Sequence, residues 1–223
     1  PGNSPGTMTI SGNVVQNTGS TLQMDIDGTG TGTGAGNYDR LVLAGSGSTF
    51  TADGALTSQL RGISGNATNT YSPPLGQGFE IITAPGGILG NFDTFIQPTS
   101  GLLPGTQFDT VFGATSLSLY ATPTSYSNMA AAGVASNNNR QQIGDILQPI
   151  RPTPGVRETN ATRKYLFDSL APQTTSSLSV AMDQLGGVGY GQIIGMNFEN
   201  SKFLADQMAS TVALHRRAEG RHL

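Results

Sequence analysis

The sequence predicts a mainly β chain with a C-terminal α region, in which narrow stacked β-turns of a solenoid precede amphipathic helices. Three observations lead to this fold class. Short runs alternate apolar and polar residues, Gly- and Asn-rich turns separate these runs, and the apolar spacing becomes helical in the last third of the chain.

The run TLQMDID, residues 21–27, shows the strand pattern most clearly, because every second side chain is apolar. Three further runs, TMTIS, RLVLAG and TSLSLYA, repeat it. The side chains expected to point inward are Leu22, Met24, Ile26, Met8, Ile10, Leu41, Leu43, Leu117 and Leu119. No stretch before about residue 125 keeps a helical apolar period, so we expect strands throughout this part.

A β-sandwich and a β-solenoid both fit short strands with frequent turns. The solenoid is favoured because each strand offers only one to three aliphatic residues, and because Thr, Ser and Asn dominate the polar faces. Exact repeats, which would settle the choice, are not visible. The sandwich therefore stays open as an alternative.

The rear of the chain predicts helices. They are expected within residues 127–150, 158–171, 176–192 and 197–217, with prolines after the first two. The apolar stripes are Ile143, Ile146 and Leu147; Tyr165, Leu166 and Leu170; Leu178, Met182 and Leu185; and Phe203, Leu204, Met208, Val212 and Leu214.

Charge divides the chain in a similar place. The net charge is −3, but residues 1–139 hold seven acidic residues against two basic ones, and residues 140–223 hold nine basic against seven acidic. Neither part is basic enough to suggest nucleic-acid binding. The chain has no Cys, which excludes a disulfide framework and thiolate catalysis.

Two motifs resemble ligand sites only loosely. The run GTGTGTGAG, Gly28 to Gly36, contains a G-x-G-x-x-A pattern, but a predicted strand follows where a dinucleotide site needs a helix. Asp25 and Asp27 before Gly28 lack the later carboxylates of a calcium loop. We therefore expect a loop and a polar strand face, with no cofactor and no metal.

An active site is not expected either. The two histidines, His215 and His222, lie at the far end, so no Ser-His-Asp triad is available in the body. Two carboxylates such as Asp39 and Asp93 could meet in a fold of strands, but nothing singles out that pair. The Asn run 137–139 is read as a polar turn and helix cap, with a processing region as the alternative.

Three segments in order, GTMTISGNVVQNTGSTLQMDIDG, YDRLVLAGSGSTFTADGALTSQL and FEIITAPGGILGNF, resemble the C-terminal passenger region of bacterial autotransporters, the type V secretion family. The residues that match the family's Gly-, Ile- and Phe-rich unit are Gly78, Phe79, Ile81, Ile82, Ala84, Gly86, Gly87, Ile88, Gly90 and Phe92. LFDSLAPQTTSSLSVAMDQLGGVGYGQ resembles the helical stretch before the family's translocator barrel, although Gly187-Val188 stands where the family often has Gly-Glu.

The resemblance implies a right-handed parallel β-helix over residues 1–126, acting as an autochaperone-like region, and a helical connector over residues 127–223 that precedes a barrel not present in this chain. The folding template would be Phe79, Ile81, Ile82, Ala84, Gly86, Gly87, Ile88, Gly90 and Phe92. The possible processing region of the chain is Asn137, Asn138 and Asn139.

The implied function is a non-enzymatic scaffold that templates passenger folding during secretion through the outer membrane of a Gram-negative bacterium and displays the passenger at the cell surface. Its partners would be its own barrel and upstream passenger turns. Because the chain begins at Pro1 without a signal peptide, we expect it to be a piece of a longer precursor. The alternative function is an adhesin-type module that contacts glycans or other cells.

Overall fold

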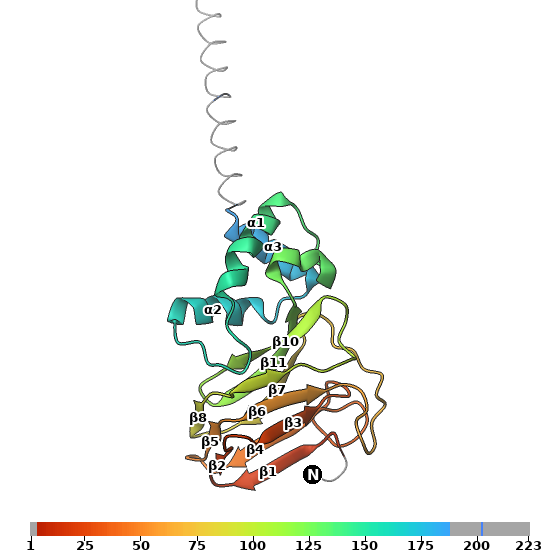
Figure 1. Ribbon diagram of the computed structural model, residues 1–223, viewed down its shortest axis with the longest axis vertical. Coiled ribbons are helices and arrows are strands. Elements are labelled where there is room, and N and C mark those ends of the chain that lie inside the picture. The colour runs from red at the N-terminus through yellow and green to blue at the C-terminus, as the bar shows by residue number, and fades with distance from the viewer. Residues whose placement is uncertain (1–3, 188–201, 203–223) are drawn as a thin grey trace, which may run out of the picture.

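The front of the molecule is a stack of three layers, each made of three short strands (Figure 1). The computed structural model describes residues 4–187 and 202. The first layer holds β1 (Thr7–Ser11), β2 (Val14–Val15) and β3 (Thr21–Asp25). The second holds β4 (Arg40–Ala44), β5 (Thr49–Ala52) and β6 (Ala55–Gln59). The third holds β7 (Gly78–Thr83), β8 (Gly87–Gly90) and β9 (Thr94–Ile96).

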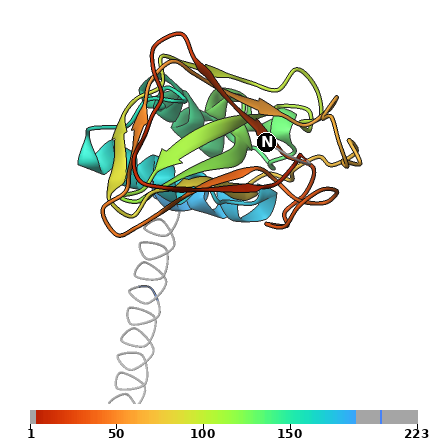
Figure 2. The ribbon, with the colours of Figure 1, turned by 90° about the horizontal axis from the view of Figure 1, so that it is seen from below.

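Every strand pairs in parallel with the strand at the same position of the next layer, giving the orders β1-β4-β7, β2-β5-β8 and β3-β6-β9. The register places apolar side chains in rows: Val14 lies opposite Phe50, which lies opposite Ile88. Seen along the stack, the strands run around a common interior (Figure 2). Alternation in the sequence therefore becomes a continuous core in space.

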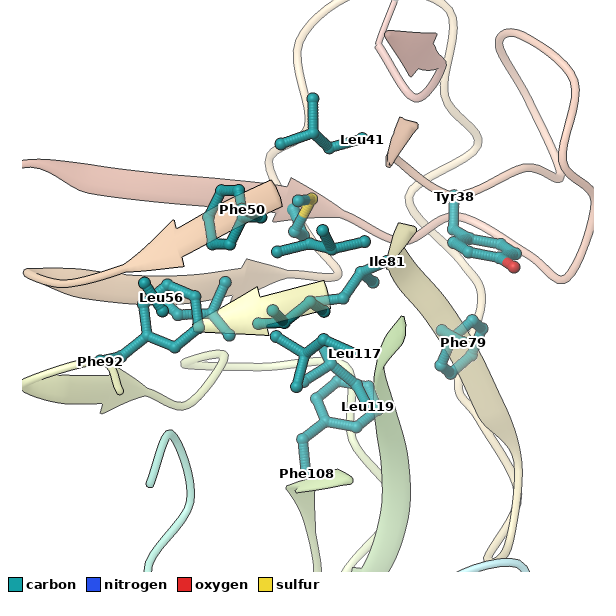
Figure 3. Close-up of a cluster of buried hydrophobic side chains, with 14 of the residues drawn as sticks. Tyr38, Leu41, Phe50, Leu56, Phe79, Ile81, Phe92, Phe108, Leu117 and Leu119 are labelled. Carbon is teal, nitrogen blue, oxygen red and sulfur yellow. The ribbon is translucent and has the colours of Figure 1, made fainter. Parts of the chain in front are cut away.

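Aromatic rings make up much of that core (Figure 3). The Phe79 ring lies beside Tyr38 at one side of the cluster and meets three other rings edge to face. Its centroid lies 5.3 Å from that of Tyr38, 5.9 Å from that of Phe108 and 6.2 Å from that of Tyr71. Phe79 and Phe108 are fully buried, so strands of the third layer and of the hairpin that follows share one core.

Strand direction reverses after the third layer. β10 (Thr106–Phe112) and β11 (Ser116–Pro123) form an antiparallel hairpin, and β11 pairs antiparallel with β7. A register shift between Leu117 and Ser118 interrupts this second pairing. The largest sheet is therefore mixed, with the order β1-β4-β7-β11-β10.

A helical unit follows the hairpin and covers that end of the stack (Figure 1). It contains two 3-10 segments, η1 (Tyr126–Ala132) and η2 (Gln148–Ile150), and the helices α1 (Asn138–Leu147), α2 (Ala161–Leu170) and α3 (Thr175–Leu185). The side chains of Asn137, Asn160 and Thr174 accept backbone N–H bonds and begin the three α-helices. This unit has a second core, which includes Tyr126, Met129, Leu147, Phe167, Leu170, Leu178 and Met182.

The predicted fold class is wrong. Instead of a mainly β chain ending a right-handed parallel β-helix, the described residues form a mixed α/β structure of three small sheets with helices. The reasons are the antiparallel strands β10 and β11, which make the largest sheet mixed, and the helical unit with a core of its own. The sandwich alternative also fails, because strands of like position pair in parallel.

Two other outcomes concern the rear of the chain. The helix predicted over residues 197–217 and both histidines lie outside the described part of the chain, apart from Lys202. Within the described part, none of the helices has the length and apolar character that a membrane crossing requires.

Candidate functional site

The stretch Phe79–Phe92 builds most of the third layer, as β7, a corner and β8. All six of its template residues with side chains are at most 4% exposed: Phe79, Ile81, Ile82, Ala84, Ile88 and Phe92. Ile81 and Ile82 are consecutive and both buried, which a simple alternating strand would not allow. We call Phe79–Phe92 the template stretch; its folding role stays a prediction.

The glycines of the template stretch let neighbouring layers approach closely. A Cβ atom on Gly86 would lie 2.3 Å from the carbonyl oxygen of Gly47, in the corner of the second layer. Gly90, at φ +71°, would place a Cβ 2.4 Å from the carbonyl oxygen of Ala52. Gly87 has a φ of +108°, which side chains disfavour. These three positions therefore require glycine for packing or for backbone geometry.

Three different elements cover the far side of the third layer, which we call the closed end. Strand β11 pairs with β7. Directly after β9, the Gln97 side chain bonds the free edge of β10: its amide donates to the Phe108 carbonyl oxygen at 2.7 Å and accepts from the Phe108 N–H at 2.9 Å. At the corner after β8, the Phe92 N–H donates to the Gly155 carbonyl oxygen at 2.9 Å. Backbone groups of β7, of Phe92 and of β10 thus find partners at this end of the stack.

The first layer has no such cover among the described residues. There β1, β2 and β3 each pair on one side only, with β4, β5 and β6. Four of their inward side chains are partly exposed, since Met8 is 37% exposed and Ile10, Val14 and Leu22 are half-buried, whereas Met24 is buried. We call this face, visible in Figure 2, the open end. The open end combines unpaired strand edges with partly exposed apolar side chains, and a further β layer could pair with these edges and cover these side chains.

Carboxylates fasten the loops beside the stack. Asp27 accepts four hydrogen bonds at 2.6–3.0 Å, from the N–H groups of Gly36, Thr68 and Asn69 and from the Thr68 hydroxyl. Burial alone would raise the pKa of Asp27, but these hydrogen bonds together hold it below the usual value. Asp27 therefore ties the loop before β4 to the loop before β7.

The pKa of Asp39 is shifted in the opposite direction from that of Asp27. Its two oxygens accept the N–H groups of Gly6 and Asp25 at 2.7 and 3.0 Å. Burial raises the pKa of the Asp39 carboxyl, and the nearby Asp25 carboxylate adds to the rise, while these two hydrogen bonds oppose it. The carboxyl thus positions the chain where it enters β1.

The structure does not bring the weakly matching motifs together as ligand sites. Asp39 faces Gly6, whereas Asp93 lies by Gly54, to whose carbonyl oxygen its N–H donates. The Gly28–Gly36 loop folds on itself, since a Cβ on Gly28 would lie 2.2 Å from the Gly36 oxygen, and β4 follows it. Nowhere in the described ranges do three or more acidic or His side chains gather around a possible metal position.

The Asn run lies at the start of α1. Asn137 is the N-cap residue, and its side chain accepts the Arg140 N–H at 2.9 Å. Asn139 lies against Gly186 at the end of α3, close enough that a Cβ there would meet its side-chain nitrogen at 2.1 Å. The alternative role of this run as a processing region stays a prediction.

Sequence reasoning missed the side chains that hold the closed end together. Gln97, Arg151 and Arg157 come from outside the template stretch, and none belongs to a periodic pattern. One signal was present: RPTPGVR places two arginines around a Pro- and Gly-containing segment in a chain with only 11% charged residues. Arginine in such a chain points to specific contacts.

The comparisons with known proteins return no relative for this chain. No family model matches the sequence, and neither the curated proteins nor the solved structures contain a match.

Proposed function

We propose that this chain is the membrane-proximal part of an autotransporter passenger, a non-enzymatic scaffold that templates passenger folding during secretion and displays the passenger on the cell surface. The observation that supports it is the contrast between the two ends of the stack. One end is closed by the hairpin and the helical unit, while the other, among residues 4–187, offers strands that are unpaired on one side and half-buried apolar side chains.

A layer that arrives at the open end would gain backbone hydrogen bonds and cover Met8, Ile10, Val14 and Leu22. In a stack of layers, stability comes mainly from the interface with the neighbour, so the first layer to form lacks a template. A preformed stack that is closed on one side removes that difficulty and lets growth proceed in one direction. Its partners under this proposal are the preceding passenger segment and its own translocator, at the outer membrane of a Gram-negative cell.

The test is surface display of the full precursor carrying Ile81→Asp or Phe92→Asp. Both side chains are buried in the third layer, so a carboxylate there should prevent the template from forming. We expect the amount of protease-resistant passenger on the cell surface to fall several-fold.

Leu89→Asp is the matched control, because Leu89 lies in the same template stretch but is 51% exposed. It should leave display near the unmodified level. Normal display by both buried variants would refute the proposal, and so would equal loss in the control.

A further inference from the structure

The connection between η2 and α2 crosses from the helical unit to the third layer. Its residues 151–157 lie along β10 and the corner after β8. The Gly155 carbonyl oxygen accepts the Phe92 N–H at 2.9 Å, and the Gly155 N–H donates to the Thr110 hydroxyl at 2.8 Å. Gly155 also packs against Phe92 and Phe95, since a Cβ there would lie 3.4 Å from the Cβ atoms of both. We call residues 151–157 the strap.

Arg151 fastens the first end of the strap to the hairpin. Its guanidinium donates to the Asp109 carboxylate at 2.5 and 3.1 Å, to the Thr122 hydroxyl at 2.8 Å and to the Pro123 carbonyl oxygen at 2.7 Å. It also lies 5.0 Å from the centroid of the Tyr126 ring. The Arg151 side chain is only 7% exposed, so this is a buried charge with several partners.

Arg157 fastens the other end directly to the template stretch. Its guanidinium donates to the Ile88 carbonyl oxygen at 2.6 Å and lies 4.7 Å from the centroid of the Phe112 ring. Its backbone N–H donates to the Asn91 side chain at 2.7 Å. The carbonyl of Ile88 belongs to β8, which pairs with β5 on its other side. Arg157 thus supplies a donor to the outer edge of the third layer, where a further strand would lie.

We propose that the strap is a closing device of the template: the third layer is complete only after residues 151–157 have docked, so the rear of the chain controls when the template stretch becomes rigid. This inference deepens the proposed function, on which its meaning for secretion rests. The strap itself can be tested on the purified chain without any secretion.

The arrangement has a consequence for the distribution of stability. Residues 78–96 and the helical unit share contacts through the strap and should open together, as one cooperative unit. The first layer has a neighbour on one side only among the described residues, so its amides should exchange faster. The molecule is then most stable at the closed end and progressively less stable toward the open end.

The experiment is hydrogen exchange of the full chain, read by mass spectrometry on peptides from Phe79–Phe92 and from Thr21–Asp25. Arg157→Met removes the donor to Ile88 but keeps side-chain bulk. We expect exchange in Phe79–Phe92 to accelerate at least tenfold, with little change in Thr21–Asp25. Arg157→Lys, which keeps the charge but not the planar fork, should recover part of the protection.

Arg163→Met is the matched control, since the ion pair of Arg163 with Glu158 stays within the rear segment. It should leave both peptides unchanged. Unchanged exchange of Phe79–Phe92 in Arg157→Met would overturn the strap, and so would equal acceleration in the control.

If Arg157→Met fails to fold, the same hydrogen-exchange measurement on Asn91→Ala tests the strap. Asn91 is exposed and contributes one hydrogen bond to the strap, so it should give the same local pattern with a smaller change. No local change in that variant would overturn the strap. Accelerated exchange with normal surface display of the same variant would support the strap and refute the template function.

Discussion

The open and closed ends of the stack are built from strands of the same kind but are treated differently by the rest of the chain. At the closed end, the antiparallel strand β11 and the strap occupy parts of the third layer's edge, and the Gln97 side chain after β9 bonds the backbone of β10. At the open end, within the described residues, β1, β2 and β3 each keep one unpaired side. The edge of a layer can therefore be covered by several unlike elements. An uncovered edge, in contrast, can be extended by one more layer of strands.

The strongest test of this difference introduces a carboxylate at each end. Ile81→Asp should lower the free energy of unfolding of the chain by about 4 kcal/mol, because the carboxylate would lie in a fully buried position of the third layer. Met8→Asp places the same group at the open end, at a 37% exposed position, and should cost less than about 1 kcal/mol. Urea titrations followed by circular dichroism measure both. Equal losses would show that the two ends are energetically alike.

A second test removes one carboxylate from an ion pair. Asp109→Ala leaves Arg151 nearly buried without its main partner, which should cost about 3 kcal/mol. Glu80→Ala breaks the pair with Arg40 in the wall of the stack, where the Glu80 side chain is 44% exposed, and should cost less than about 1 kcal/mol. Thermal unfolding of the two variants gives the comparison. A smaller loss for Asp109→Ala than for Glu80→Ala would contradict the importance assigned to the closed end.

Glycine substitutions test the close approach of layers. Gly86→Ala would bring a Cβ within 2.3 Å of a backbone oxygen, so the second and third layers must separate, at about 2 kcal/mol. Gly47→Ala, at the corner directly opposite, meets no atom within 4 Å and has no positive φ, so it should change stability by less than about 0.5 kcal/mol. The denaturation midpoint of Gly86→Ala should therefore lie below that of Gly47→Ala.

The smallest expected effect is a pH dependence in the loops near the first layer. Because the pKa of Asp27 is lower in the folded chain than in the unfolded one, its contribution is fully present above the unfolded value and is lost as the pH falls through the folded value. Asp27→Asn should cost about 1.5 kcal/mol at pH 7 and make stability less sensitive to pH below about 4. Unfolding free energies measured from pH 7 to pH 2 test this, and parallel curves for both proteins would contradict it.

Asp39 supplies an internal contrast for that experiment. Its pKa is raised in the folded chain, so protonation of Asp39 favours folding and its ionised form weakens stability as the pH rises through that value. Asp39→Asn should therefore cost less at pH 7 than Asp27→Asn. The reverse order would show that the hydrogen bonds of Asp39 outweigh its burial.

Local pattern predicted the strands well, because alternation is a property of a few neighbouring residues. Leu41, Leu43, Leu117 and Leu119 are buried as expected. The stack itself was harder to see, since loops of unequal length separate the strands of successive layers and hide any repeat. The predicted fold class is wrong at β11, because the alternation of apolar and polar residues does not indicate whether a strand pairs parallel or antiparallel.

The helices show a different limit. Leu178 and Met182 are buried as predicted, but Tyr165 is 77% exposed and Ile146 is 63% exposed, while Phe167 is buried instead. Helices as short as α1 and α2 can carry apolar residues on more than one face, and the element they pack against decides which face is buried. The strap residues form no periodic pattern at all, so only the structure places Arg151 and Arg157 against the hairpin and the template stretch.

The loop before β7 offers a place where the chain could be lengthened without disturbing the layers. Below its tip, the Asn69 side chain joins the Ile63 backbone through bonds of 2.8 and 3.2 Å, and Asp27 holds Thr68. Residues 64–66 beyond this clamp are exposed. Because the ends of the tip are already held together, a longer insert adds little closure entropy. Foreign epitopes or enzymes grafted between Ser64 and Gly65 would then be carried by the stack as cargo.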